Sequence, residues 1–222
     1  TVGSETIIEH GRLANENPPQ LKTFDRFGHR IDEIEFHPSY HALMSNAMEN
    51  EAHCVAWTAN KPGAHTVQGA MLHLTAQPDG GYTCPICLPY SSLPVVRKVP
   101  ALAAIWESKL TGTEYDSRCL PVEQKTSATI AIPLTEKQGG SDLRSNTTQA
   151  RAIGSGGSGE EYELTGHKYF CSAAMSDAFL TVAQAPGGHS CFLVPRWRPD
   201  GTKNQFQLQQ LKKKMGNVSN AT

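Results

Sequence analysis

Residues 126–142 read TSATIAIPLTEKQGGSD, and the chain changes character within this stretch. Its first part, 126–134, is rich in threonine, isoleucine and alanine and predicts a β-strand. Its second part, 135–142, sets two adjacent glycines among hydroxyl-bearing side chains and predicts a loop, because glycine lets the backbone turn sharply. The stretch therefore predicts that a β-rich part of the chain begins near residue 126.

The residues that follow keep this strand character. Short runs of strand-forming residues, separated by turn residues, lie at 147–153, 162–170, 178–185 and 190–197. Gly187 and Gly188 predict the tip of a hairpin. The Pro-Asp-Gly run at 199–201 predicts a tight turn, because proline presets φ and glycine accepts a positive φ. These runs predict an antiparallel β part.

The residues before 126 have helical periodicity instead. Pro38 suits the first turn of a helix, where its missing N–H costs nothing. Two further helices are expected, one stopped by turn residues at 78–81 and one that follows Pro100 and is closed by Gly112. We expect their apolar stripes to face a core: Tyr40, Leu43, Met44, Ala47 and Met48 in the first, Val67, Ala70, Met71 and Leu74 in the second, Leu102, Ile105, Trp106 and Leu110 in the third.

Helices followed by strands predict an α+β fold. We place an N-terminal helical domain at 1–125 and an antiparallel β domain, of barrel or sandwich type, at 126–222. No turn or capping residue marks a domain end after the Met-Gly-Asn run at 215–217. We therefore expect that the β domain is cut off before it closes.

Charge and composition argue against several classes of protein. The net charge is -1 and the two signs are interspersed, so no nucleic-acid-binding surface is expected, and the lysines at 212–214 are interpreted as a solvated strand face. No apolar run approaches the ~20 residues of a membrane span, and residues 1–10 lack the layout of a secretory signal. The six cysteines are irregularly spaced and are expected to be free thiols. We expect an intracellular protein, cytoplasmic or mitochondrial and not secreted.

Two motifs have an ordinary structural explanation. The run GSGGSG at 154–159 formally satisfies the dinucleotide fingerprint, but a strand-like pattern follows where a helix is needed, so we predict a flexible hairpin loop. Cys84 and Cys87 form a single C-x-x-C pair, whereas a structural zinc site needs four ligands. We predict apolar packing for the pair. A metal site that includes His65 or His73 is the alternative, and a redox role ranks below it.

The loop at 135–142 and the segment GHKYFCS at 166–172 are the strongest candidates for a binding site. Successive N–H groups of the loop, with the hydroxyls of Thr135 and Ser141, can satisfy carbonyl or phosphate oxygens, although an ordinary turn explains them equally well. The segment is an aromatic strand that ends in a hydroxyl. It can wall a flat heterocycle, but a plain β core is the simpler explanation.

In this order and spacing the two clusters resemble the acyl-CoA dehydrogenase family, in which a T-E-x-x-x-G-S-D loop precedes a G-x-K-x-aromatic-x-Ser/Thr strand by about 25 to 30 residues. Lys137 and Gln138, where the main family has a Pro-containing pair, make the chain similar to the AidB branch of adaptive-response flavoproteins. Further runs that look AidB-like are SNTT at 145–148, GRLAN at 11–15, NPP at 17–19, FHP at 36–38, YDS at 115–117 and GNVSN at 216–220.

The resemblance implies that the chain binds FAD and takes part in α,β-dehydrogenation of an acyl-CoA thioester. Thr135 and Ser172 are the implied hydrogen-bond partners of the isoalloxazine, and Phe170 is implied to pack on its ring. Ser141 is implied to reach the pyrophosphate or the acyl-CoA substrate. The full cofactor-binding set implied in this way is Ile132, Leu134, Thr135, Gly140, Ser141, Phe170, Cys171 and Ser172.

The resemblance also implies parts that lie outside this chain. The family's base is a carboxylate in a C-terminal helical domain, so no catalytic residue is expected here, Glu136 included, and the chain alone is expected to be inactive. A homo-oligomer, by resemblance a tetramer, is implied for the complete protein. The alternative is an AidB-like flavoprotein with a protective or DNA-associated role and little dehydrogenase activity, with DNA bound only through the C-terminal part.

Overall fold

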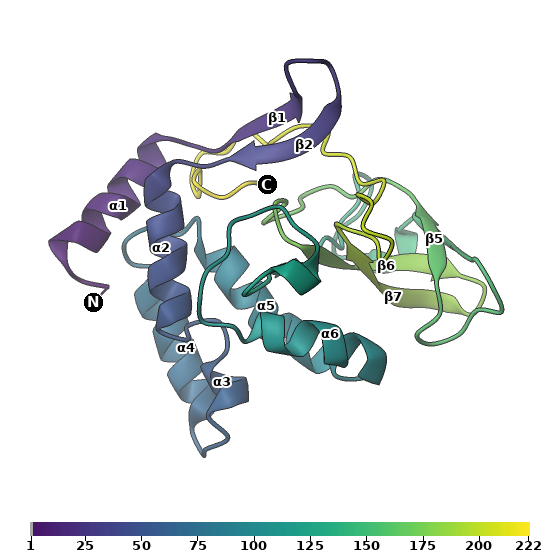
Figure 1. Ribbon diagram of the computed structural model, residues 1–222, viewed down its shortest axis with the longest axis horizontal. Helices are drawn as coiled ribbons and strands as arrows, with labels where there is room; N and C mark the ends of the chain where they lie inside the picture. Colours follow the sequence, from purple (N-terminus) through teal and green to yellow (C-terminus); the bar gives the residue numbers. More distant parts are fainter. Residues whose placement is uncertain (1) are drawn as a thin grey trace.

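A computed structural model describes residues 2–222, with the helices in the N-terminal part and a sheet in the C-terminal part (Figure 1). The helices are α1 Glu5–Glu16, α2 Pro38–Glu49, α3 Val55–Thr58, α4 Ala64–Thr75, α5 Thr83–Val96 and α6 Pro100–Leu110, with short 3₁₀ turns at Val122–Gln124 and Leu143–Ser145. The strands are β1 Gln20–Phe24, β2 Arg30–Glu35, β3 Ile130–Ala131, β4 Gln149–Ala152, β5 Tyr162–Thr165, β6 Ala178–Ala185 and β7 Gly188–Pro195. Within residues 2–222 no helix has the length and apolar character needed to cross a membrane. The predicted α+β class is confirmed.

The helix predicted after Pro38 is α2, and its core face is the predicted one. Pro38 occupies the first turn, and the ring of His37 caps the helix by accepting a hydrogen bond from the N–H of Ser39 at 3.2 Å. Tyr40, Leu43, Met44, Ala47 and Met48 are all buried in one cluster with Ile7 and Ala14 of α1. The sequence pattern therefore predicts both the position and the orientation of this helix.

The helix α4 is confirmed and Met71 packs on the core as predicted, but the rest of the predicted core face is wrong. Val67 and Leu74 are 48 % and 53 % exposed, and Gln68 is the residue that is buried. The side-chain carbonyl of Gln68 accepts from the N–H of Ala56 at 3.3 Å, and its amide donates to the carbonyl of Ala52. Because Gln68 satisfies the hydrogen-bonding groups of the Ala56 N–H and the Ala52 carbonyl, this polar side chain is buried on the core side of α4. In α6 the same correction applies to Ile105, which is 42 % exposed, whereas Trp106 and Leu110 are buried.

Nothing in the sequence pattern predicts α5, because Pro89 and Pro94 interrupt it. A proline inside a helix removes the N–H that would bond the carbonyl four residues earlier. For Pro94 that carbonyl belongs to Tyr90, and the indole N–H of Trp57 donates to it at 2.9 Å instead. Packing of Trp57 against α5 thus satisfies the group that the proline leaves without a partner.

The sheet is mixed rather than wholly antiparallel. Its order is β3-β6-β4-β5, and β7 lies on the other edge of β6 as an antiparallel hairpin from Ala178↔Pro195 to Ala185↔Gly188. Along their shared edge, β3 and β4 pair with β6 in parallel. The predicted hairpin tip is confirmed, with Gly188 at a φ of 111°. The loop at 154–159 joins the antiparallel pair β4 and β5, as its strand-like flank predicts. Within residues 2–222 the sheet does not close into a barrel.

The helical and β parts share one core. Leu93, Val96, Trp106 and Leu110 of α5 and α6 pack with residues of β3 and β6 in a single buried cluster. Next to it, the buried Lys125 donates to the carboxylate of Asp177 at 2.5 Å, and the N–H of Thr129 donates to the same carboxylate at 2.8 Å. The domain boundary between residues 125 and 126 stays a prediction. The elements on its two sides are joined by the shared core and by the ion pair of Lys125 with Asp177.

Helix α1 approaches the turn at 78–81 so closely that only glycine fits at one point. A Cβ on Gly11 would lie 2.2 Å from the backbone oxygen of Pro78. We expect Gly11→Ala to lower the free energy of unfolding by about 1–3 kcal/mol, because the clash outweighs the better helix propensity of alanine. Gly69→Ala in α4 is the matched control, since nothing lies within 4 Å of its Cβ position and stability should rise by up to about 1 kcal/mol. Urea denaturation measures both, and an equal gain in the two variants would contradict the contact.

Candidate functional site

The structure brings the two predicted clusters together. The N–H of Tyr169 donates to the carbonyl of Thr135 at 2.8 Å. The ammonium of Lys168 donates to Oε1 of Glu136 at 2.9 Å. The loop at 135–142 and the segment at 166–172 therefore form one structural unit, as the order of the motifs in the sequence suggests.

The carboxylate of Glu136 holds this unit in place. Glu136 is only 2 % exposed, and Oε2 accepts from the N–H and the hydroxyl of Thr147 at 2.7 and 2.9 Å. Oε1 accepts from the N–H of Thr148 at 3.0 Å, and the amide of Gln138 donates to Oε2 at 2.7 Å. Burial by itself raises the pKa of Glu136, but the hydrogen bonds from Thr148, Thr147 and Lys168 outweigh it and hold the pKa well below its usual range. The carboxylate is an anchor that stays charged at neutral pH, and its low pKa makes it a poor proton acceptor for catalysis.

The glycines of the loop have separate roles. Gly139 closes a tight turn in which the N–H of Glu136 donates to the carbonyl of Gly139 at 3.0 Å, and a Cβ there would lie 2.4 Å from Oγ of Ser145. Gly140 and Ser141 are exposed instead. A Cβ on Gly140 would lie 3.6 Å from Oγ1 of Thr135, so the missing side chain keeps the approach to that hydroxyl open. The exposed end of the loop thus offers hydroxyl and N–H donors to a ligand.

The predicted strand over 162–170 ends early. Strand β5 stops at Thr165, and Phe170 has a φ of 62°. A positive φ is unusual for a bulky residue and marks strain that the surroundings impose. The ring of Phe170 is 44 % exposed, meets Tyr169 edge to face at 4.4 Å, and has the ammonium of Lys212 3.8 Å from its centre. Two aromatic rings thus lie together here with a cation on one of them, and their role as the wall of a binding site stays a prediction.

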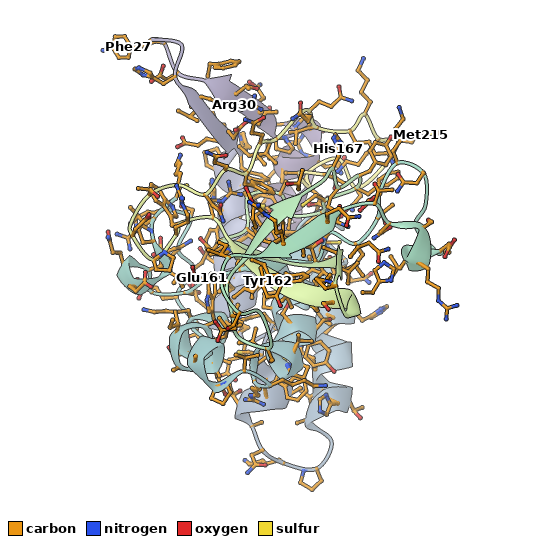
Figure 2. All side chains as sticks on the ribbon, turned by 90° about the vertical axis from the view of Figure 1, so that its right-hand side faces the viewer. Phe27, Arg30, Glu161, Tyr162, His167 and Met215 are labelled. Carbon is orange, nitrogen blue, oxygen red and sulfur yellow. The ribbon has the colours of Figure 1, made fainter. Side chains whose placement is uncertain are left out.

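The C-terminal segment covers the end of this cluster. The N–H groups of Ala173 and Ala174 donate to Oδ1 of Asn220 and to the carbonyl of Ala221, each at 3.3 Å. The hydroxyls of Ser172 and Thr222 lie 3.4 Å apart. In Figure 2, His167 and Met215 both lie toward the upper right of the molecule.

The interpretation of the lysines at 212–214 as a solvated strand face is wrong. These residues form no strand, and Lys212 lies on the ring of Phe170. Lys214 is half-buried, because its ammonium donates to the carbonyl of Asn220 at 2.5 Å. Lys212 and Lys214 therefore make contacts within the chain, whereas Lys213 is exposed as predicted.

The remaining residues of the predicted set are built into the fold. Ile132 packs on the shared core of α5, α6 and the sheet. The carbonyl of Leu134 accepts from the side-chain amide of Asn146 at 2.8 Å. Cys171 packs beside Phe179, and burial raises the pKa of its thiol to about 12. Their contact with a ligand stays a prediction.

The sequence carries little signal for the supporting network. Asn146, Thr147 and Thr148 stand out only as part of a run that looks AidB-like, and their hydrogen bonds to Leu134 and Glu136 are not predicted. Only one feature points to them: a buried carboxylate needs donors, and adjacent threonines after an asparagine supply backbone and hydroxyl donors together.

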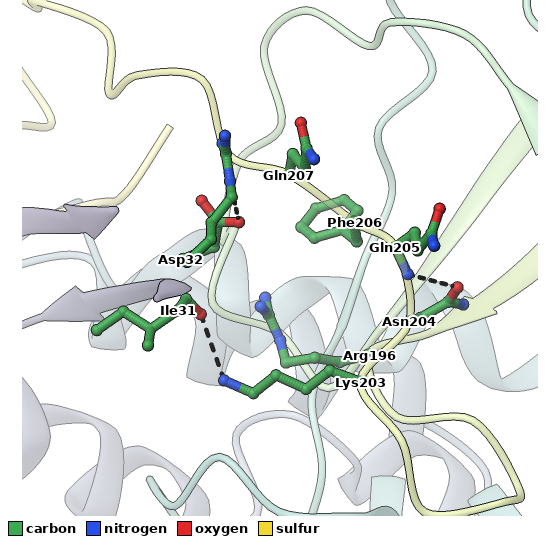
Figure 3. A pocket seen from close by; sticks show the side chains of 9 residues that line it. Ile31, Asp32, Arg196, Lys203, Asn204, Gln205, Phe206 and Gln207 are labelled. Atoms are coloured by element: carbon green, nitrogen blue, oxygen red, sulfur yellow. Dashed lines mark hydrogen bonds and ion pairs between the residues drawn. The ribbon is translucent and has the colours of Figure 1, made fainter. Parts of the chain in front are cut away.

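Two hollows of the structure lie away from the predicted set. One, of about 360 Å³, lies between the β1–β2 hairpin and the segment at 203–207, where Lys203 donates to the carbonyl of Ile31 at 3.3 Å and Arg30 pairs with Asp32 (Figure 3). The other, of about 190 Å³, is lined by residues that include His41, Tyr115 and Asp177. Neither includes Thr135, Phe170 or Ser172. Among the described residues no group of three or more His, Cys, Asp or Glu is placed to hold a metal ion.

Comparisons with known proteins match both parts of the chain. The family model "Adaptive response protein AidB N-terminal domain" matches residues 1–117, and the model "Acyl-CoA dehydrogenase, middle domain" matches residues 131–222. The chain is 43 % identical to the AidB protein of Escherichia coli K12 over its whole length, which is 40 % of the length of that protein. It is 28 % identical to acyl-CoA dehydrogenase family member 11 of Caenorhabditis elegans, with 94 % of this chain and 35 % of the relative aligned.

Solved structures show the same fold. The crystal structure of C. elegans ACDH-11 in complex with C11-CoA has a TM-score of 0.82 at 24 % identity, covering 99 % of this chain and 38 % of that one. A glutaryl-CoA dehydrogenase from Mycobacterium smegmatis in complex with FADH2 has a TM-score of 0.57 at 18 % identity, covering 82 % of this chain and 44 % of that one. The chain thus spans less than half of the length of these relatives.

The anchoring role of Glu136 has a measurable signature. We expect Glu136→Gln to lower the free energy of unfolding by about 3 kcal/mol near neutral pH, at the low end for a buried pair, because it leaves the half-buried Lys168 without its charge partner. Glu163→Gln is the matched control: Glu163 and Arg151 form an exposed pair, worth about 0–1 kcal/mol. Urea denaturation gives both values, and equal losses would contradict the anchoring role.

The pH dependence follows from the depressed pKa of Glu136. The stabilisation is fully present above the unfolded pKa, near 4.5, and is lost as pH falls through the lower folded pKa. The difference in unfolding free energy between wild-type protein and Glu136→Gln should therefore narrow below about pH 4.5. A difference that stays constant from neutral to acid pH would show that the charge of Glu136 does not stabilise the fold.

Proposed function

The chain belongs to the acyl-CoA dehydrogenase family, in its AidB branch, and on this basis we propose that its β part holds FAD. The complete protein would then be an oxidoreductase that dehydrogenates an acyl-CoA thioester between its α and β carbons. The observation that carries the proposal is the junction of the two motif segments, where Tyr169 bonds to Thr135 and Lys168 to Glu136.

The residues present fit a flavin. Gly140 leaves the approach to the hydroxyl of Thr135 open, and exposed N–H groups and the hydroxyl of Ser141 follow it. Such donors suit carbonyl and phosphate oxygens. Further support comes from the fold, since structural relatives were solved with FADH2 and with C11-CoA. Bound FAD supplies the acceptor for hydride, while the protein binds and orients the reactants.

We assign these roles to the chain's own residues. Thr135 and Ser172 donate hydrogen bonds to the isoalloxazine, and Ser141 reaches a phosphate of the cofactor or of the acyl-CoA. Phe170 packs against the ring system, which requires that the ammonium of Lys212 leave the face of Phe170. Ile132, Leu134, Gly140 and Cys171 complete the wall of the site.

The base for α-proton removal is proposed to lie outside this chain. Glu136 is the buried carboxylate of the loop, and its depressed pKa and full set of donors leave it without a role in proton transfer. The family members matched are more than twice as long as this chain, so they have room for a further domain. We propose that such a domain completes the acyl-CoA site and the homo-oligomer, and that this chain alone does not turn over substrate.

A protective, AidB-like role with little dehydrogenase activity is the second candidate. The match of residues 1–117 to the AidB N-terminal domain favours it over a typical enzyme of fatty-acid oxidation. With a net charge of -1, this chain offers no general attraction for nucleic acid, so DNA association would arise elsewhere in the complete protein. Turnover of acyl-CoA thioesters by the complete protein separates the two candidates.

Flavin retention tests the proposed site. We expect the purified chain to keep visible flavin absorption after incubation with FAD and desalting. Thr135→Ala and Ser172→Ala should each weaken binding roughly fivefold, since one neutral hydrogen bond is worth about 1 kcal/mol. Ser155→Ala, in the exposed loop at 154–159, is the control and should bind as wild type does. Loss of all flavin on desalting of the wild-type chain would show that this chain does not hold FAD by itself.

A further inference from the structure

Cys84 and Cys87 lie in the first turn of α5, and the predicted role as small apolar packing residues does not describe their surroundings. Both are half-buried rather than enclosed in the core, and both are free thiols. Residues three apart on a helix lie on the same face, about 5–6 Å apart at their Cβ atoms. A disulfide needs Cβ atoms about 3.5–4.5 Å apart, so the first turns of the helix must adjust by roughly 1–2 Å for the pair to bond.

The two sulfurs interact with each other and with the end of the helix. The thiol of Cys87 donates to the carbonyl of Cys84 at 3.4 Å, and it favours negative charge on the Cys84 sulfur. No side chain caps the N-terminus of α5, so its first-turn N–H groups carry an uncompensated partial positive charge. Cys84 lies within this turn, where negative charge on its sulfur is favoured.

Groups from other elements act on Cys84 in the same direction. The hydroxyl of Ser172 and the ammonium of Lys214, which is held by the carbonyl of Asn220, both favour negative charge on the Cys84 sulfur. The hydrogen bond from Cys87 is the largest of the effects that lower the pKa of the Cys84 thiol; burial opposes them, and Ser172 and Lys214 add to the lowering. The same hydrogen bond raises the pKa of Cys87, which keeps that thiol protonated.

The other charged and titratable groups around this pair are few. Asp79 acts on Lys214, and its carboxylate is occupied by the N–H of Gly81 and the hydroxyl of Ser219. The phenol of Tyr40 is buried and its pKa is raised by burial, so it stays neutral. Lys212 is the second cation on this side of the site.

We propose that Cys84 and Cys87 are an oxidisable dithiol, with Cys84 the nucleophile and Cys87 the resolving thiol, that reacts with hydroperoxides. The arrangement that supports it is a C-x-x-C pair at an uncapped helix N-terminus, with a hydroxyl and an ammonium contributed by distant parts of the chain. The proposal does not rest on flavin binding.

The reaction balances with a hydroperoxide as the oxidant. The thiolate of Cys84 attacks one peroxide oxygen, the O–O bond breaks, and the leaving oxygen takes up a proton as water or an alcohol. Cys84 is then a sulfenic acid. The sulfur of Cys87 attacks the sulfur of Cys84, the S–O bond breaks, and hydroxide leaves with the proton of Cys87 as water. Two thiols are oxidised to a disulfide, and the peroxide is reduced by two electrons.

The remaining cysteines are internal controls. Cys191 is exposed on β7, so a reagent reaches it freely, but the partial burial of its sulfur raises the pKa of its thiol. Burial also raises the pKa of Cys54, to about 12. If the exposure of the sulfur sets the rate of reaction, Cys191 reacts faster than Cys84. If the fraction of thiolate sets the rate, Cys84 reacts faster.

Alkylation with iodoacetamide, followed by peptide mass spectrometry of the wild-type chain, separates these explanations without any variant. Near pH 7 we expect Cys84 to be alkylated on the order of tenfold faster than Cys191. Lys214→Met should slow alkylation of Cys84 several-fold and leave Cys191 unchanged. Equal or faster alkylation of Cys191 in the wild-type chain would overturn the nucleophilic role of Cys84.

Treatment with hydrogen peroxide tests the second half of the proposal. We expect the wild-type chain to lose the mass of two hydrogens, because a disulfide joins Cys84 and Cys87 within one peptide. A thiol reductant should restore the original mass. Cys87→Ser should instead gain one oxygen on Cys84, and Cys84→Ser should resist oxidation of Cys87. Stable oxygen addition at Cys84 in the wild-type chain, with no crosslink, would overturn the dithiol.

Discussion

The candidate site depends on one buried charge, the carboxylate of Glu136. Three separate stretches of chain supply its donors: the loop itself through Gln138, the adjacent threonines at 147 and 148, and Lys168 from the segment after β5. Without a partner, a buried carboxylate is costly, so the native arrangement of all three stretches is fixed by the need to satisfy it. The open end of the loop at Gly140 and Ser141 is thereby held against the aromatic segment. The glycine-containing loop has a defined conformation because hydrogen bonds to Glu136 fix its first turn.

The shared core sets where this surface lies relative to the helices. Leu93 and Trp106 pack directly on β3 and β6, and the ion pair of Lys125 with Asp177 fixes the junction. Cys84 at the start of α5 is consequently placed beside Ser172, far from it in the sequence. Ser172 therefore belongs both to the surroundings of the proposed thiol pair and to the proposed flavin site. This follows from the packing of α5 against the sheet and not from either motif alone.

Patterns with a single period are predicted well from the sequence. The stripe of α2 corresponds to the observed helix because one face of it is buried. The strand-forming runs at 178–185 and 190–197, with glycine at the hairpin tip, correspond to β6 and β7. Predictions fail where tertiary contacts override the pattern. Gln68 is buried because it satisfies two backbone groups, α5 tolerates Pro94 because Trp57 reaches Tyr90, and the chain turns at Phe170 because Lys212 and the last residues pack over it. Both motif segments could be located from sequence, whereas the network around Glu136 could not, since hydroxyl and backbone donors leave no periodic signal.

Hydrogen–deuterium exchange of the chain, with and without saturating FAD, tests the central claim most directly. We expect the loop at 135–142 and the segment at 166–172 to gain protection together, with no change in the exposed loop at 154–159. Protection confined to the hollow lined by Arg30, Arg196 and Lys203 would contradict it, because flavin would then bind away from both motifs.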